Sequence, residues 1–199
     1  MSDNTDDKET NDLMSEAKAC LVDGIRDAGG PVDSVADTVS DTIARTLRGT
    51  RAVGSDFLDL IACVATGVVH GLAEVETETS EAARFAMVGV LHGARRIGRV
   101  GVEAVSGCAT AVVRGAAEAG GDVGRAAKGA IEGAIESARD LGVSIEDASQ
   151  AAAHGVLNAA GDLGAAGLSQ VRYVLIDAIS GASMLREPVR VEGRPMRPH

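Results

Sequence analysis

The sequence has almost no aromatic side chains: it contains no Trp, one Tyr and two Phe among its 199 residues. Aromatic side chains supply much of the apolar area that an ordinary globular core buries. Their near absence excludes a core of that kind, so this chain must bury area by close approach of its backbone, which small residues permit. Ala, Gly and Val dominate instead, and their helical spacing argues against a β protein.

Basic residues are also scarce, because 19 Lys and Arg face 29 Asp and Glu and give a net charge of −10. That balance excludes nucleic acid as a partner, since phosphate neutralisation needs clustered basic side chains. The chain also lacks an uncharged apolar run long enough for an ordinary transmembrane helix, and residues 60–73 come nearest. The acidic, polar N-terminus is not a secretory signal, so we expect a cytoplasmic or inner-membrane-associated protein.

Motifs that carry chemistry are missing as well. The three cysteines, Cys20, Cys63 and Cys108, form no CxxC pair and no metal-ligand spacing, which indicates structural thiols. No serine lies in a nucleophile elbow, and the glycine-rich stretches do not follow a strand as a phosphate-binding loop must. The sequence therefore predicts no enzyme, no catalytic residue, no cofactor, no metal and no small-molecule substrate.

What the chain does contain is an eleven-residue repeat, which runs without insertion from 45 to 176, with a stronger 22-residue period superimposed. Eleven residues in three turns give about 3.67 residues per turn, so any supercoil is nearly straight or weakly right-handed. The polar positions of each unit share one face, and roughly two-thirds of the circumference is apolar. Such a helix needs neighbours on two or three sides, or lipid on one of them.

Glycines recur on or beside this apolar face, although each costs about 1 kcal/mol relative to Ala inside a helix. Their regular spacing favours a glycine zipper, in which small residues let two helices approach closely. The predicted helix-packing residues are Gly67, Gly71, Gly89, Gly93, Gly115, Gly129, Gly133 and Gly155.

The predicted fold class is all-α, built from long hendecad-repeat helices in a coiled coil or bundle. These helices either pair between chains or fold back, first at 74–81 and second at 120–122. The stretch 141–144 also resembles a helix stop and a capping box. Against all three breaks stands the polar frame, which continues unchanged across them. The predicted segments are a disordered acidic arm at 1–11, a short helix at 12–30, the repeat region at 34–176 and a basic, Pro-containing tail at 184–199.

Three polar groups could suggest chemistry, but each has a simpler interpretation. His70 and His92 occupy the same repeat position about 33 Å apart on one helix, so they cannot bind one metal there; we interpret them as solvated, with a ring in a symmetric oligomer as the alternative. The acidic cluster within 74–81 is interpreted as a solvated helix end, with cation attraction as the alternative. Arg95, Arg96 and Arg99 are interpreted as partners in ion pairs.

The units GVLHGARRIGR, GAIESARDLGV and GVLNAAGDLGA resemble the Ala/Gly-rich hendecad coiled-coil proteins of bacteria, including the membrane-associated kind. This resemblance covers 45–176 and concerns the type of repeat. There is a looser similarity to the eleven-residue repeats of lipid-surface proteins, from which this chain departs by its acidic balance, its glycines and its few lysines.

The sequence thus predicts a non-enzymatic, self-assembling helical protein with a structural or scaffolding role, whose partner is a second copy of itself. The alternative is a membrane-associated oligomer that forms a pore or coats a lipid surface, with membrane lipid as the partner. Charged residues are costly against lipid but tolerated against a lumen, so the pattern permits both.

Overall fold

The computed structural model describes residues 55–74, 76–96 and 101–184, together with the single positions 15, 19, 40, 41 and 44. The described residues form six helices and no strand. The helices are α3 (Ser55–Glu74), α4 (Thr79–Arg95), α5 (Val102–Glu118), α6 (Val123–Leu141), α7 (Ile145–Asp162) and α8 (Gly164–Met184). The all-α fold class is confirmed.

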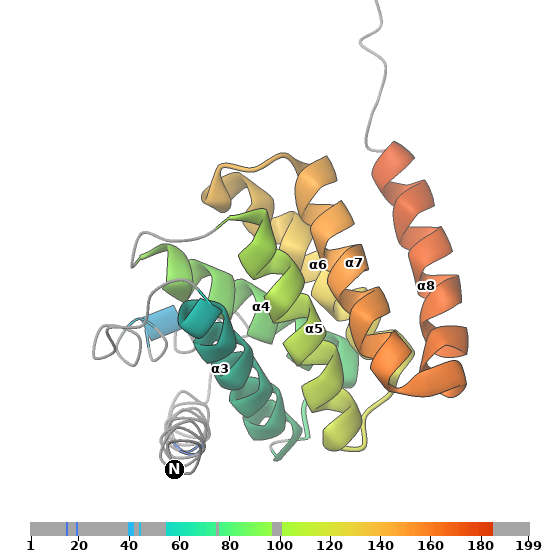
Figure 1. Ribbon diagram of the computed structural model, residues 1–199, viewed down its shortest axis with the longest axis horizontal. Helices are drawn as coiled ribbons and strands as arrows, with labels where there is room; N and C mark the ends of the chain where they lie inside the picture. Colours follow the sequence, from blue (N-terminus) through green and yellow to red (C-terminus); the bar gives the residue numbers. More distant parts are fainter. Residues whose placement is uncertain are drawn as a thin grey trace, which may run out of the picture.

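The helices stack in two rows, with helices that are two apart in sequence lying side by side (Figure 1). One row contains α3, α5 and α7, and the second begins with α4 and α6 behind it. The last helix, α8, packs against both α6 and α7. Helices that follow one another in the sequence also touch, from α3 and α4 to α7 and α8. Every helix therefore packs against helices of its own row and of the other row.

Each reversal of the chain is built by residues whose conformation stops a helix. Gly142 adopts the left-handed φ of 72°, and the Val143 amide then bonds back to the Ala138 carbonyl at 3.1 Å. Ser144 caps α7 by accepting the Asp147 amide at 3.0 Å. The helix stop and cap that the sequence suggests at 141–144 are therefore present.

Left-handed residues recur with the 22-residue period of the sequence. Among the described residues, positive φ values occur at Glu76, Gly120, Gly142 and Gly164; position 98 is also a glycine and lies outside the described residues. One helix plus one connection therefore occupies two eleven-residue units. The polar frame survives each turn because the turn is part of the repeat.

The expected reversals at 74–81 and 120–122 are both observed, since α3 ends at Glu74 and Asp122 caps α6. The helices are nevertheless shorter than the long hendecad helices we expected, at 17 to 21 residues. Further connections follow Arg95, Leu141 and Asp162. The expectation of long helices was wrong because the polar pattern repeats every eleven residues and one helix with its connection spans two units. The pattern is therefore the same whether the helix continues or turns back.

The core is made mainly of Ala and Val side chains, joined by a few larger ones. Ile61, Leu72, Met87 and Leu91 are the largest fully buried side chains and lie in α3 and α4. Farther along the stack, α6 and α7 bury mostly Ala and Gly. With so little side-chain volume, the helices of this part must lie close together to exclude water.

Several predicted segments fall largely outside the described residues. The acidic arm at 1–11 and positions 185–199 of the tail are among them. Of the helix predicted at 12–30, positions 15 and 19 are described, and both are helical.

Candidate functional site: the repeated contacts between helices

The structure places all eight glycines of the predicted zipper in buried positions. They are Gly67 and Gly71 on α3, Gly89 and Gly93 on α4, Gly115 on α5, Gly129 and Gly133 on α6, and Gly155 on α7. For the last four, the nearest atoms of another element belong to the helix two places earlier in the same chain.

Two of these glycines touch the backbone of the neighbouring helix directly. A β-carbon on Gly155 would overlap the carbonyl oxygen of Ser106 in α5, and one on Gly129 would overlap that of Ser80 in α4. In both pairs the glycine comes 49 residues after its contact. Any larger residue must push the helices apart, so glycine sets the spacing of both rows.

The remaining two glycines make the same kind of contact at slightly longer range. A β-carbon on Gly133 would lie 2.8 Å from the Arg84 carbonyl oxygen, and one on Gly115 would lie 3.2 Å from the Thr66 Cα. The Gly115 contact again spans 49 residues. Close backbone approach is therefore a repeated property of the stack.

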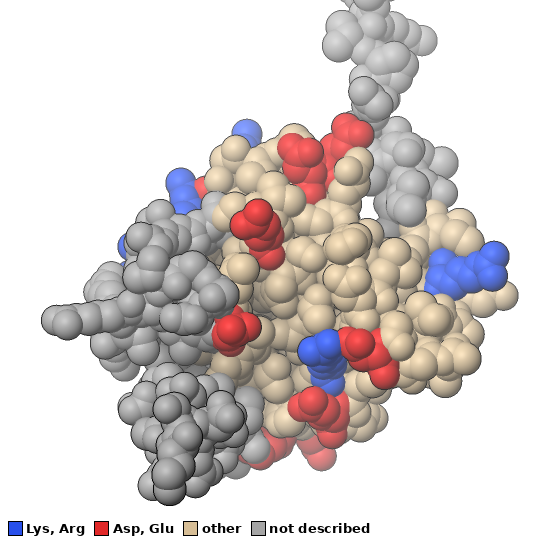
Figure 2. All heavy atoms as spheres, in the orientation of Figure 1, with Lys and Arg blue, Asp and Glu red and all other residues tan. Residues whose placement is uncertain are grey.

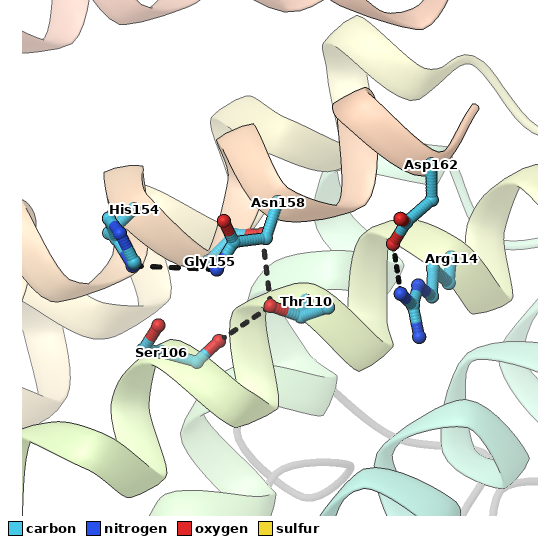
Figure 3. Close-up of polar contacts among 7 residues, drawn as sticks. All are labelled: Ser106, Thr110, Arg114, His154, Gly155, Asn158 and Asp162. Carbon is cyan, nitrogen blue, oxygen red and sulfur yellow. Dashed lines mark hydrogen bonds and ion pairs between the residues drawn. The ribbon is translucent and has the colours of Figure 1, made fainter. Parts of the chain in front are cut away.

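Threonine hydroxyl groups join neighbouring helices of the first row at equivalent points. The Thr110 hydroxyl lies 3.0 Å from the carbonyl oxygens of Ser106 in its own helix and of Gly155 in α7, and can donate its hydrogen to either (Figure 3). Thr66, which is 44 residues earlier, reaches Ala62 at 3.1 Å and Ala111 in α5 at 3.5 Å. The α5–α7 contact thus repeats the α3–α5 contact after a shift of 44 residues.

Ion pairs follow the same shift of 44 residues along this row. Arg114 of α5 pairs with Asp162 of α7 (Figure 3), and His70 Nε2 of α3 lies 3.6 Å from Glu118 of α5. Both members of each pair are offset by 44 residues from those of the other. His70 therefore lies beside a carboxylate of α5, whereas we expected its side chain to be solvated.

The second row carries its own set of polar contacts. His92 Nε2 of α4 lies 2.9 Å from Asp140 of α6 and is shielded from solvent, and it makes no hydrogen bond. Arg84 pairs with Glu136 at 3.0 Å. His92, like His70, is only about one-third exposed and lies beside a carboxylate, so neither histidine matches the solvated interpretation.

The acidic cluster at 74–81 contains a helix cap. Glu78 accepts the backbone amides of Ser80 and Glu81, both at 3.1 Å, and pairs with Arg125 of α6 at 2.8 Å. The hydrogen bond from Arg125, together with the two amides, lowers the pKa of the Glu78 carboxyl. Glu78 thus starts α4 and also ties it to α6.

The described cysteines pack between helices, and of the arginines predicted to form ion pairs Arg96 does so, whereas Arg95 is exposed. Cys108 is buried and Cys63 is half-buried, and burial raises the pKa of both thiols. Arg96 pairs with Asp41. Arg99 and Cys20 lie outside the described residues. Within the described part of the chain, no group of three or more His, Cys, Asp or Glu is arranged to hold a metal ion.

Comparison of the sequence with models of known protein families gives no match. Comparison with characterised proteins gives none either. Among the helices that the structure describes, none is long and apolar enough to cross a membrane. On the face drawn in Figure 2, basic side chains lie apart from one another.

The two threonine contacts and the turn at Gly164 were not predicted, and the turns at 74–81, 120–122 and 141–144 were predicted singly, without their common period. The signal was available in the spacing, because Thr66 and Thr110 are 44 residues apart and the glycines at 98, 120, 142 and 164 are 22 apart. Glycine with a strict 22-residue period outside the packing face indicates a turn in each period.

Proposed function

We propose that this protein is a non-enzymatic structural module, in which a stack of short helices forms a scaffold that assembles with copies of itself. The observation that carries this proposal is the repetition of interhelix contacts after 44 residues. In stacked-repeat proteins each unit contacts mainly its neighbours, and stability grows with the number of units. The side chains that could suggest chemistry, His70 among them, are here used between helices.

The electrostatic contacts support the same role. Each ion pair between neighbouring helices of one row is at least partly exposed, so each contributes only about 0–1 kcal/mol. Their main effect is on register, because a shift of one residue would separate every pair at once. A repeat with this fixed register suits a rigid spacer or platform better than a site that must rearrange around a substrate.

Light scattering of the purified full chain without detergent tests this proposal. A scaffold that assembles gives a helical particle whose mass is a multiple of the 20.1 kDa chain and rises with concentration. A monomer at every concentration contradicts self-assembly. Recovery of the protein in a membrane pellet that resists high salt would instead favour the lipid-associated alternative.

A further inference from the structure

Among the described residues, most of the exposed large apolar side chains lie at the α7–α8 end of the stack, and Val102 of α5 is the exception. Val113 of α5 is fully buried, whereas Leu157, its counterpart 44 residues later on α7, is 44% exposed. On α8, Leu168 is 44% exposed, Ile176 58% and Tyr173 79%. A terminal repeat that faced water would be expected to carry a polar outer side.

The exposed residues of α8 form one continuous surface, which we name the α8 face: Leu168, Arg172, Tyr173 and Ile176. Leu168, Arg172 and Ile176 are four residues apart and Tyr173 follows Arg172, so at about 100° per residue all four fall within an arc of about 140°. Val171 and Leu175 lie on the adjacent side of the helix and are buried against the stack. Helix α8 therefore has two apolar sides. One is packed against the stack, and the other, the α8 face, is exposed.

Tyr173 marks the point where the repeat changes. Its counterpart 44 residues earlier is Gly129, which touches the backbone of α4. A tyrosine in that place cannot allow so close an approach, and α8 accordingly turns Tyr173 outward. Tyr and Arg are enriched where proteins bind other proteins, since both combine a large contact area with a polar group.

We propose that the α8 face is the surface through which two copies of this chain associate as a symmetric dimer. This inference rests on the proposed function, for which it names the interface. Charge favours a second copy at this place: the chain carries −10 overall, yet residues 164–176 contain one Arg and no Asp or Glu. Figure 2 shows basic and uncharged atoms, without acidic ones, over the described part of α8 at the right of the view.

The area is that of a small interface. The described side chains of α8, those of residues 164–176, extend over about 20 Å. With α7 beside it at an axial distance of about 10 Å, the end of the stack is about 20 Å wide. A patch on the order of 400 Å² in projection is about half of the roughly 800 Å² that each partner buries in a standard interface, so we expect a dimer that dissociates on dilution.

A closed pair is favoured over a fibre, because the opposite end of the stack is covered. Gly67 and Gly71 of α3 correspond to Ala111 and Gly115 of α5, which face α3, and both glycines are buried. A copy therefore cannot add its α8 face to that surface. An interface that uses the same patch on both partners closes at two chains.

The test compares the full-length chain with two variants. The first carries Tyr173→Glu and Ile176→Glu, which place charges on the α8 face; the second carries Val102→Glu on α5, a control whose exposure of 43% matches the 44% of Leu168. We expect dimers for the original chain and for the second variant. The first variant should raise the dimer dissociation constant at least about 30-fold, the loss of one strong contact residue.

Circular dichroism checks that both variants keep their helices, and Leu168→Glu provides an independent variant on the same face. Unchanged dimerisation of the Tyr173/Ile176 and Leu168 variants overturns the proposed interface but leaves self-assembly intact. A monomeric original chain overturns both proposals. If that monomer binds anionic phospholipid vesicles and the Tyr173/Ile176 variant does not, the α8 face is a lipid-binding surface instead.

Discussion

Gly155→Ala measures how much the close approach of α5 and α7 contributes to stability. A β-carbon at this position overlaps the carbonyl oxygen of Ser106, which is backbone and cannot rotate away. The helices must therefore separate, and a gap of about 0.5–1 Å already forfeits a quarter to a half of the dispersion energy across a contact. Overpacking of this kind costs about 1–3 kcal/mol, against a gain of about 1 kcal/mol in helix propensity.

Gly107→Ala is the matched control. Gly107 lies in α5, one residue after Ser106, and a β-carbon there meets no atom within 4 Å. This substitution gains the same propensity without an overlap, so we expect stabilisation by about 0.5–1 kcal/mol. Gly155→Ala should instead destabilise the chain by about 1–2 kcal/mol. Urea denaturation followed by circular dichroism measures both, and a Gly155→Ala chain as stable as the control would refute the reasoning.

Three further substitutions test the turns, the threonine contacts and the caps. Glu76→Gly should stabilise the chain by about 1 kcal/mol in urea denaturation, because Glu76 has a φ of 58° where the equivalent turns carry glycine; a loss of stability would contradict the turn. Thr110→Val should cost about 1 kcal/mol by removing the hydroxyl between α5 and α7, and an unchanged midpoint would show that the contact is neutral. Glu78→Ala should cost about 1 kcal/mol in thermal denaturation at neutral pH through loss of the α4 cap. Because folding lowers the pKa of Glu78, the stabilisation by its carboxylate is present above the ordinary glutamate pKa and is lost as the pH falls. The melting temperatures of the Glu78→Ala variant and of the original chain should therefore converge in acid. A difference that stays constant with pH would contradict this.

The sequence was informative about helix type and packing positions, because both depend on local spacing. Small residues with a helical period predict an all-α fold, and the predicted glycines are buried in the structure. Their partners could not be predicted in the same way. Ser106 and Gly155 meet only because the helices of one row are stacked with a fixed shift, and that shift is a property of the whole chain.

Helix length was the main point on which the sequence was ambiguous. A helix with its connection occupies two eleven-residue units, so the polar frame at 120–122 and 142–144 continues through residues that are turns. The deciding local signals are the left-handed glycines and the caps at Asp122 and Ser144. Each is weak alone, and their 22-residue spacing gives them weight.

The environment of the two histidines also could not be predicted from the sequence. Their spacing along one long helix would separate His70 from His92 by about 33 Å and leave both in solvent. In the stack each lies beside a carboxylate of the helix two places later, Glu118 for His70 and Asp140 for His92. Such neighbours are about 48 residues away in sequence, beyond any local pattern.

The central claim, that residues 44 apart lie side by side in a stack, is tested most directly by a distance between α3 and α5. Spin labels at the exposed positions Asp59 and Glu103 are suitable, in a chain whose native cysteines are replaced by alanine and which is diluted with unlabelled chain. The stack predicts backbones about 10 Å apart, the spacing of packed helices. A continuous helix over the same residues would place them about 66 Å apart, and a distance in that range would contradict the account.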